Sequence, residues 1–320
     1  MDPLNGEITV EVDGSTVAKM DGADADRPSA LYSTIGGLKN VHHLRMARFR
    51  VGTGGADSLA AAINRYTSLL TLSLTETGLY SAGATAISRG LSQISGLSSL
   101  NLDGNGIGPK GLKAIAEAVP CCTALKHVSL ADNALADEGA CVLARSLLTD
   151  PPDARPGCGR YLVLLALRNN NIGPAGCAEL CGALVETCAA QMLYFDLSDN
   201  PLTACGNDFA PAAALGAALK AMPALRALNL SNTELYAEGG RLVVEGLTHK
   251  ERDLRQQILA TVRRAGEEKR SLDGELGRLE AELKQYQAQR PLQNLNLDRN
   301  LVRTFDSYRS SPQFRLTHHD

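Results

Sequence analysis

The sequence predicts an α/β solenoid, in which short strand–helix units stack into a horseshoe with a parallel inner sheet and outer helices. Three observations support this: an apolar pattern that recurs about every 28 residues, a glycine at a constant offset from it, and a charged segment with helical leucine spacing near the C-terminal end. A unit of this size cannot bury its own apolar face, whereas stacked copies can. The charged segment predicts an antiparallel helical hairpin inserted into the stack.

An apolar residue at the centre of each predicted strand sets the repeat frame. From Leu72 in LLTLSL, the pattern recurs 28 residues earlier at Leu44 and 28 residues later at Leu100. The eight origins are Leu44, Leu72, Leu100, Val128, Leu165, Phe195, Leu228 and Leu295. Side chains alternate along a strand, so we expect the leucines of LxxLxL to point inward and the residues between them to point outward.

A glycine stands eleven residues after each of the first seven origins. These residues are Gly55, Gly83, Gly111, Gly139, Gly176, Gly206 and Gly239. We expect them at the turn before each helix. Apolar pairs four residues apart follow, such as Ile87/Leu91 and Leu180/Leu184, and mark the inward stripe of a helix.

A polar residue five positions after the origin recurs as asparagine. The asparagines are Asn105, Asn133, Asn170, Asn200 and Asn300, with Thr77 and Thr233 at the same position in two other copies. An amide both donates and accepts hydrogen bonds, so a stacked column of asparagines can satisfy the turns where the strands end. Phe49 cannot do this, which predicts that the first copy is an end unit.

The LxxLxLxxNxL pattern, the 28-residue period and the glycine before the helix resemble the ribonuclease-inhibitor-like leucine-rich repeat family. That family includes Ran GTPase-activating proteins, tropomodulin-type actin proteins and sensor domains of innate immune receptors. The resemblance covers residues 41–247 and 291–302. It implies a leucine-rich repeat horseshoe that binds proteins, and it is specific for the fold but weakly specific for the function.

The frame divides the chain into four parts. We expect an N-terminal cap (1–40), repeats 1–7 (41–247), the inserted charged hairpin (248–290), and a C-terminal half repeat with a tail (291–320). In the cap, Ile8–Val12 predicts a strand and SALYSTIGGL a short helix. The Pro- and Gly-rich segment Thr149–Arg160 predicts a surface loop. The sixth copy is five residues longer than the period, and we assign the surplus to its Ala-rich helix.

Residues 248–290 hold 18 charged residues in 43. Five residues spaced 4, 3, 4 and 3 apart form a coiled-coil seam: Leu272, Leu276, Leu279, Leu283 and Tyr286. The chain must return to the sheet to place Leu295, so we predict a hairpin that turns near Ala265–Lys269, with Leu254 facing Leu279 and arms of roughly 27 Å. A single long helix that pairs with another chain is the alternative.

Composition limits the partners and the cellular compartment that we expect for the protein. The net charge of −3 predicts no nucleic-acid partner, and no apolar run is long enough for a membrane span. The N-terminal segment carries no signal-peptide pattern, so we interpret the eight cysteines as reduced, buried thiols. We expect a cytoplasmic protein, with cytoskeletal or flagellar association by analogy.

No established catalytic motif is present in the sequence. Gly52–Gly55 and Gly104–Gly111 fail the phosphate-loop patterns and are explained by the repeat. His42 and His43 alternate on one strand, and Cys177 and Cys181 have no further ligands. We therefore predict no enzyme, no cofactor and no metal.

The outward strand positions predict a partner-binding concave face. The candidate residues are Arg45, Arg48, Glu76, Asp103, Asp132, Arg168, Tyr194, Asp196, Asp199, Asn229, Asn296 and Asp298. With the hairpin, they predict a non-enzymatic scaffold or adaptor in a larger, cytoskeletal or ciliary assembly.

Two other functions stay open at this point. The first is regulation of a small GTPase of the Ran GTPase-activating type through Arg48 or Arg50, although the Gly-Arg-Val context and the acidic tail of that family are missing. The second is inhibition of an enzyme, which the scarcity of aromatic residues on the concave face disfavours.

Overall fold

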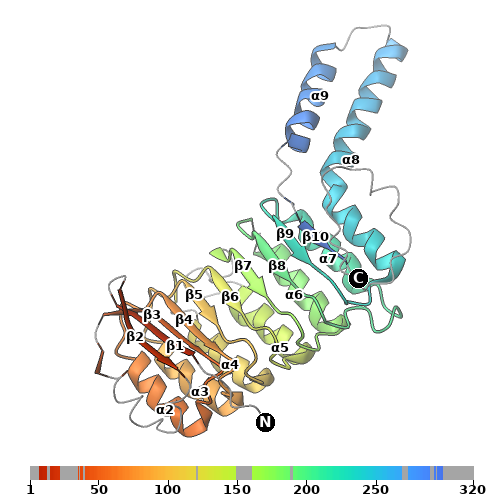
Figure 1. Ribbon diagram of the computed structural model, residues 1–320. Helices are drawn as coiled ribbons and strands as arrows, with labels where there is room; N and C mark the ends of the chain where they lie inside the picture. Colours follow the sequence, from red (N-terminus) through yellow and green to blue (C-terminus); the bar gives the residue numbers. More distant parts are fainter. Residues whose placement is uncertain are drawn as a thin grey trace.

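The computed structural model describes residues 7–12, 15–21, 35, 37–38, 40–119, 122–148, 161–187, 190–268, 273–288, 292 and 294–297 (Figure 1). The strands are β1 (Glu7–Val12), β2 (Ser15–Asp21), β3 (Val41–Ala47), β4 (Thr71–Thr75), β5 (Ser99–Asn101), β6 (His127–Ser129), β7 (Leu164–Ala166), β8 (Tyr194–Asp196), β9 (Ala227–Asn229) and β10 (Asn294–Asn296). The helices are α2 (Gly52–Ile63), α3 (Tyr80–Leu91), α4 (Gly108–Ala118), α5 (Ala136–Leu143), α6 (Pro174–Glu186), α7 (Ala210–Lys220), α8 (Tyr236–Glu268) and α9 (Asp273–Ala288).

The strands form one sheet in the order β10-β9-β8-β7-β6-β5-β4-β3-β1-β2. From β3 to β10 every neighbouring pair is parallel, and each predicted origin pairs with the next, as Leu72 does with Leu100 and Leu228 with Leu295. This open parallel sheet, with strands and helices alternating along the chain, confirms the solenoid and the repeat frame.

The core lies between the sheet and its helices. Helices α2 to α7 lie on one side of the sheet (Figure 1). The residues that point toward them are almost fully buried, as at Leu72, Leu74 and Leu165. Burial of a leucine side chain contributes about 2 kcal/mol, and each unit repeats this contribution only because its neighbours cover it.

A ladder of buried asparagines ties the strand ends together. Asn105, Asn133, Asn170 and Asn200 are at most 1% exposed. The amide of Asn170 donates to Leu167 O in its own repeat (3.0 Å) and to Leu130 O in the preceding one (2.8 Å), while its oxygen accepts from the Asn133 N–H (3.0 Å). The predicted column is therefore confirmed, except at Asn300, which lies outside the described residues.

The repeated glycines do not precede the helices, as the sequence predicted. Six of the seven lie inside the first helical turn; only Gly206 stands in a turn, with φ +79°. A Cβ on Gly111 would lie 2.9 Å from Ser81 Cα and 3.0 Å from Ala84 Cβ of the preceding helix. These glycines therefore permit adjacent helices to approach closely.

The five extra residues of the sixth unit were also assigned to the wrong place, its Ala-rich helix. Helix α7 begins at Ala210, fifteen residues after the origin Phe195, whereas α3 begins at Tyr80, eight residues after Leu72. The two helices have 11 and 12 residues, so the extra residues lie in the turn before α7. Alanine-rich composition alone did not distinguish a longer helix from a longer turn.

The N-terminal segment contributes two strands rather than the one predicted. Strand β1 pairs antiparallel with β3, and β2 pairs antiparallel with β1, so the edge of β3 is covered. Of the predicted cap helix only Ile35 and Gly37–Leu38 lie among the described residues. The Tyr66 hydroxyl donates to Ile35 O, and burial raises the pKa of Tyr66 to about 12.

Helix α8 runs without a break from the seventh repeat through the predicted boundary at 247/248 to Glu268. Four of the five residues assigned to a turn, Ala265–Glu268, are therefore helical. Beyond the sheet, α8 and α9 lie side by side (Figure 1). Thr149–Arg160, Leu272 and residues 298–320 lie outside the described residues.

Two contacts fix how α8 and α9 are aligned. Lys250 Nζ lies 5.3 Å from the centroid of the Tyr286 ring, and Gln287 donates to Glu251 Oε1 (3.1 Å). Lys250 and Glu251 of α8 therefore lie level with Tyr286 and Gln287 of α9. The pairing of Leu254 with Leu279 stays a prediction, because leucine spacing sets a face of each helix and leaves the register open.

Candidate functional site

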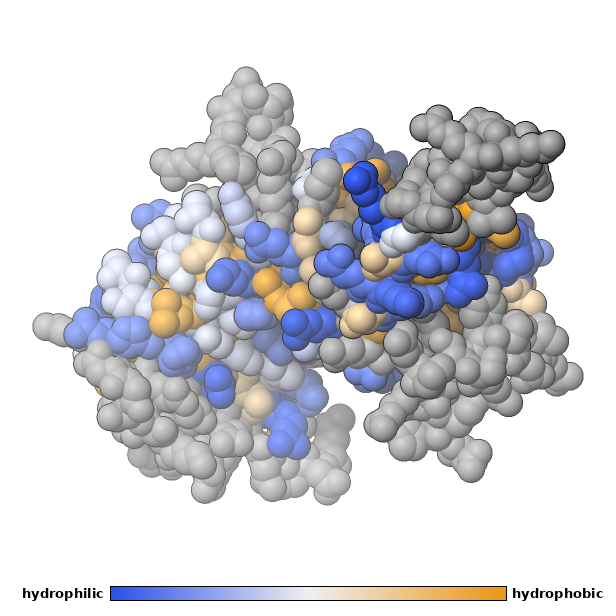
Figure 2. All heavy atoms as spheres, turned by 90° about the horizontal axis from the view of Figure 1, so that it is seen from above, coloured by the Kyte–Doolittle hydropathy of each residue, from blue (hydrophilic) through white to orange (hydrophobic). Residues whose placement is uncertain are grey.

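The face of the sheet away from the helices, here called the open face, carries the outward strand residues. Among the described residues no helix covers it (Figure 1). The residue after each origin forms a column in strict register: Arg45, Ser73, Asn101, Ser129, Ala166, Asp196, Asn229 and Asn296. From above, the visible surface is largely hydrophilic, with hydrophobic residues in small groups (Figure 2).

The residue four positions after each of the first seven origins has a left-handed backbone. Arg48, Glu76, Asp132, Asn169, Asp199 and Asn232 have φ between 50° and 57°, and Gly104 has 69°. Asn, Asp and Gly tolerate this conformation best, which explains their frequency in the column. The chain turns there from strand to helix, and the side chains line the carboxyl ends of the strands.

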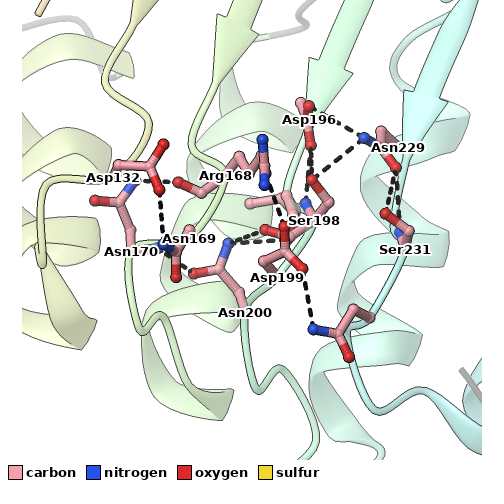
Figure 3. A network of polar contacts seen from close by, with 12 residues as sticks. Asp132, Arg168, Asn169, Asn170, Asp196, Ser198, Asp199, Asn200, Asn229 and Ser231 are labelled. Carbon is pink, nitrogen blue, oxygen red and sulfur yellow. Dashed lines mark hydrogen bonds and ion pairs between the residues drawn. The ribbon is translucent and has the colours of Figure 1, made fainter. Parts of the chain in front are cut away.

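Polar side chains at these carboxyl ends link the fourth to the seventh repeat (Figure 3). Asn169 Nδ2 donates to Asp132 Oδ1 (2.6 Å), and Arg168 Nε donates to Asp199 Oδ2 (2.7 Å). Asp199 Oδ1 in turn accepts from Asn232 Nδ2 (2.9 Å). The hydrogen bond to Asp199 is the main cause that raises the pKa of Arg168.

A second set of contacts joins β8 to β9 at the same edge. Asp196 Oδ1 accepts from the backbone N–H (2.9 Å) and the hydroxyl (2.6 Å) of Ser198. Asp196 Oδ2 accepts from Asn229 Nδ2 (3.2 Å), whose oxygen accepts from the Ser231 hydroxyl (3.0 Å). We call these two sets together the carboxyl-edge network. Its groups are held by their neighbours before any partner arrives, so little entropy remains to be lost on binding.

The structure brings together only some of the predicted candidates. Asp132, Arg168, Asp196, Asp199 and Asn229 belong to the carboxyl-edge network. Asp103 accepts from Ser129 and from the Ala131 N–H further along the same edge. Arg45, Arg48 and Glu76 are exposed at the other end of the sheet, and Asn296 lies on β10. Tyr194 is 45% exposed on β8, and Asp298 lies outside the described residues.

Of the two positions before each origin, the sequence prediction took up only Tyr194. It missed Leu164 on β7 and the residues just before β7 and β8, Val163 and Leu193; none of these four residues is buried. Strand alternation already indicated that the residue before an inward origin points outward, so Leu164 could have been found beside Tyr194.

The chemistry of this surface is that of binding. Carboxylate and amide oxygens accept from amide, hydroxyl and guanidinium donors, an arrangement that orders side chains. Within the described ranges no group of three or more His, Cys, Asp or Glu could hold a metal ion. None of the helices in those ranges is long and apolar enough to cross a membrane.

The described cysteines differ in exposure. Cys122, Cys177 and Cys181 are buried, and Cys141 is half-buried. The hydrogen bond with Cys177, together with burial, raises the pKa of Cys181, which disfavours a reactive thiolate. Cys205 is exposed, contrary to the expectation of buried thiols, because it stands in the lengthened turn before α7.

A family model described as a leucine-rich repeat matches residues 97–116, 121–144 and 160–181. These matches support a leucine-rich repeat protein. The matched segments cover the repeats whose origins are Leu100, Val128 and Leu165, three consecutive units of the stack. Such repeats are generally protein-interaction modules, which agrees with a surface of ordered polar groups. No curated protein matches the chain.

Proposed function

We propose that this protein is a non-enzymatic scaffold or adaptor of the ribonuclease-inhibitor-like type, with two separate binding surfaces on one rigid body. The main observation that supports this proposal is helix α8, which packs as the seventh repeat helix and then continues, unbroken, beyond the sheet. A continuous helix transmits orientation, so partners on the open face and on the projecting segment are held at a set distance and angle. Two sites on one body favour multivalent assembly.

We further propose that residues 248–290 form an arm that folds on itself as an antiparallel helical hairpin. The contacts of Lys250 with Tyr286 and of Glu251 with Gln287 support this over a single helix paired with another chain. The arm borders a hollow of about 510 Å³ lined by Lys250, Arg278, Ala281, Glu282, Gln285 and Tyr286. Further out, Leu259 is 68% exposed. Both features are available to a partner.

The remaining organisation of the chain follows the same proposal. Residues 1–40 cap the first repeat, residues 41–247 form seven repeats, and residues 291–320 supply a half repeat and tail. By analogy with arm-bearing repeat proteins we place the protein in the cytoplasm, within a cytoskeletal or ciliary complex. This setting is supported by resemblance alone.

The proposal is tested by shortening the arm. Residues 254–283 are replaced by a short Gly–Ser linker, which keeps the base contacts of Lys250 and Glu251. We expect the unfolding midpoint of the solenoid to stay within a few degrees. Affinity purification with cross-linking mass spectrometry is expected to lose one subset of partners and to retain those cross-linked to the open face.

The matched control for this test replaces only an exposed residue near the base of the arm and on another face than Leu259, Asp253→Asn. It should retain both subsets. A partner set that is identical for the wild type, the shortened arm and variants of the open face would overturn the scaffold proposal.

Regulation of a small GTPase is the weaker alternative. Its supporting observation is that Arg48 and Arg50 are both exposed at the turn after β3. Acceleration of GTP hydrolysis by the chain, abolished in Arg48→Ala or Arg50→Ala, would favour this alternative. Unchanged hydrolysis across a panel of small GTPases would remove it.

A further inference from the structure

Apolar side chains on the open face concentrate on two neighbouring strands. In the column one position before the origins, Thr71, Ser99 and Asn294 are polar, whereas β7 and β8 carry Leu164 and Tyr194 directly opposite each other. The preceding residues Val163 and Leu193 are also apolar and only partly buried. We call Val163, Leu164, Leu193 and Tyr194 the apolar strip.

Small residues lie beside the apolar strip on one side and along β7. Ala227 of β9 pairs with Tyr194, and Ala166, two residues after Leu164, is the apolar member of its column. On the other side, His127 of β6 pairs with Leu164. Because the side chains next to the exposed tyrosine are small, they leave a shallow depression beside its ring. A tyrosine that is 45% exposed on an otherwise polar sheet face is a typical anchor position for a protein partner.

The two flanks of the apolar strip carry opposite charge. At the amino ends of the strands, Lys126 and Arg226 are exposed, and neither has an ion-pair partner within the described part of the chain. At the carboxyl ends stand three carboxylates, Asp132, Asp196 and Asp199. One guanidinium, that of Arg168, faces them, so this flank keeps a negative excess.

The backbone of these strands excludes one common mode of binding. β7 pairs with β6 and β8, and β8 pairs with β7 and β9, so neither offers a free edge to an added strand. A partner must therefore engage side chains. A strand rises about 3.3 Å per residue, so the three steps from the column of Lys126 and Arg226 to the column of Asp196 span roughly 10 Å, close to the 10–12 Å diameter of a helix that crosses the strands.

We infer that the apolar strip seats an amphipathic helix of a partner protein whose apolar stripe is bordered by acidic residues on one flank and basic residues on the other. The acidic flank lies over Lys126 and Arg226, and the basic flank lies over Asp132, Asp196 and Asp199. The opposed charges select one orientation of the helix, because the reversed orientation places like charges together. This inference rests on the proposed scaffold function and names the chemistry of one partner.

The test uses a display library of small three-helix bundles in which one exposed helix face is randomised. The full chain is the target. The strip variant is Tyr194→Glu, and the matched control is Val185→Glu, since Val185 is 42% exposed on helix α6, on the other side of the sheet. Circular dichroism and thermal unfolding confirm that both variants fold.

We expect enriched clones to carry an apolar stripe with acidic and basic flanks. They should lose at least tenfold in affinity for Tyr194→Glu and keep their affinity for Val185→Glu. Clones with an acidic flank should also weaken severalfold against the double variant Lys126→Glu/Arg226→Glu, in a salt-dependent manner.

Three results would overturn the inference: no enrichment on the full chain, clones that bind Tyr194→Glu as well as wild type, or clones without segregated charge. Self-association of the chain that disappears in Tyr194→Glu would assign the strip to a second copy and also overturn it. The scaffold proposal survives each of these results, because its own test scores partners cross-linked to the arm and to the rest of the open face.

Discussion

The repeat stack and the projecting arm are stabilised in different ways, although α8 belongs to both. In the stack, polar groups at the strand ends are buried and form hydrogen bonds with the neighbouring repeat. The Asn133 N–H donates to the Asn170 oxygen, and the Asn170 amide donates to Leu130 O. In the first part of α8 beyond Tyr236, the polar contacts are exposed ion pairs. Arg241 contacts Glu238 and Glu245, and Arg252 contacts Glu245 (2.5 Å).

This difference shows where each region draws its stability. The stack depends on contacts between residues about 28 apart in the chain, so loss of one buried group affects two repeats. The arm depends on contacts three to seven residues apart and on the α9 contacts near its base. Exposed ion pairs contribute little and are screened by salt, so the arm is the part whose surface can vary without loss of the fold.

Removal of one ladder amide is the largest expected effect. Asn170→Ala leaves the carbonyls of Leu130, Leu167 and Arg168 without this donor and the Asn133 N–H without its acceptor. We expect a loss of about 3–5 kcal/mol in the free energy of unfolding, measured by chemical denaturation. The control Asn169→Gly, at the adjacent exposed left-handed position, should cost under about 1 kcal/mol. Equal losses of stability in the two variants would contradict the claim that the buried asparagines stabilise the stack.

The junction of stack and arm is tested by a pair of chemically identical substitutions. A Cβ on Gly246 of α8 would collide with the Gly216 carbonyl of α7, and a Cβ on Gly216 would lie 2.7 Å from the Leu242 oxygen. Gly246→Ala should therefore destabilise by about 2–3 kcal/mol. Gly182→Ala, where α6 leaves open space, should stabilise by about 0.5–1 kcal/mol. Differential scanning calorimetry of both variants shows whether each substitution lowers or raises the stability.

Alkaline pH tests the stability of the N-terminal end of the stack through the buried Tyr66. The pKa of Tyr66 is raised by burial to about 12, above its ordinary value of 10.0, so the unfolded chain loses this proton first. Stability is complete below about pH 10 and falls as the pH rises toward 12. Tyr66→Phe should be less stable at neutral pH but show a flatter decline above pH 10. Parallel decline in both proteins would exclude Tyr66 as the cause.

The smallest effect is expected at the base of the arm, where Arg252 contacts Glu245 of the seventh repeat. The hydrogen bond from Arg252 and its charge lower the pKa of Glu245, so these ion pairs are present above the ordinary Glu range and are lost as the pH falls below it. Glu245→Gln should leave the unfolding midpoint of the stack unchanged and slightly reduce helicity by circular dichroism. The reduction should vanish in about 1 M salt. A shift of the stack midpoint would show that the two regions are coupled.

Most of the fold could be predicted because the repeat presents the same evidence many times. The origins and the asparagine positions recur at one spacing, and period-two alternation already assigns Leu72 inward and Ser73 outward. The repeated glycines were found but misplaced, because a fixed offset does not say whether Gly111 is needed for a turn or for a close helix contact. Strand β2 was missed, since STVAKMD has no counterpart among the repeats.

The candidate site was predicted less completely. The column that contains Asp196 and Asn229 followed from alternation, yet nothing in the spacing showed that Arg168 reaches Asp199 rather than Asp132. Those choices depend on side-chain length and on the twist between neighbouring strands. The apolar strip was overlooked, although Tyr194 was a candidate, because Leu164 is an ordinary strand residue until neighbouring strands are compared.

The sequence alone determined the repeat, its period and the direction of each strand residue, because local alternation and constant spacing are properties of the chain itself. Only the tertiary structure decided the register of α9 on α8, the contact of Gly216 with Gly246 and the opposed charges around Tyr194. These features join residues from separate units, and their geometry is set by how the units stack rather than by any one segment.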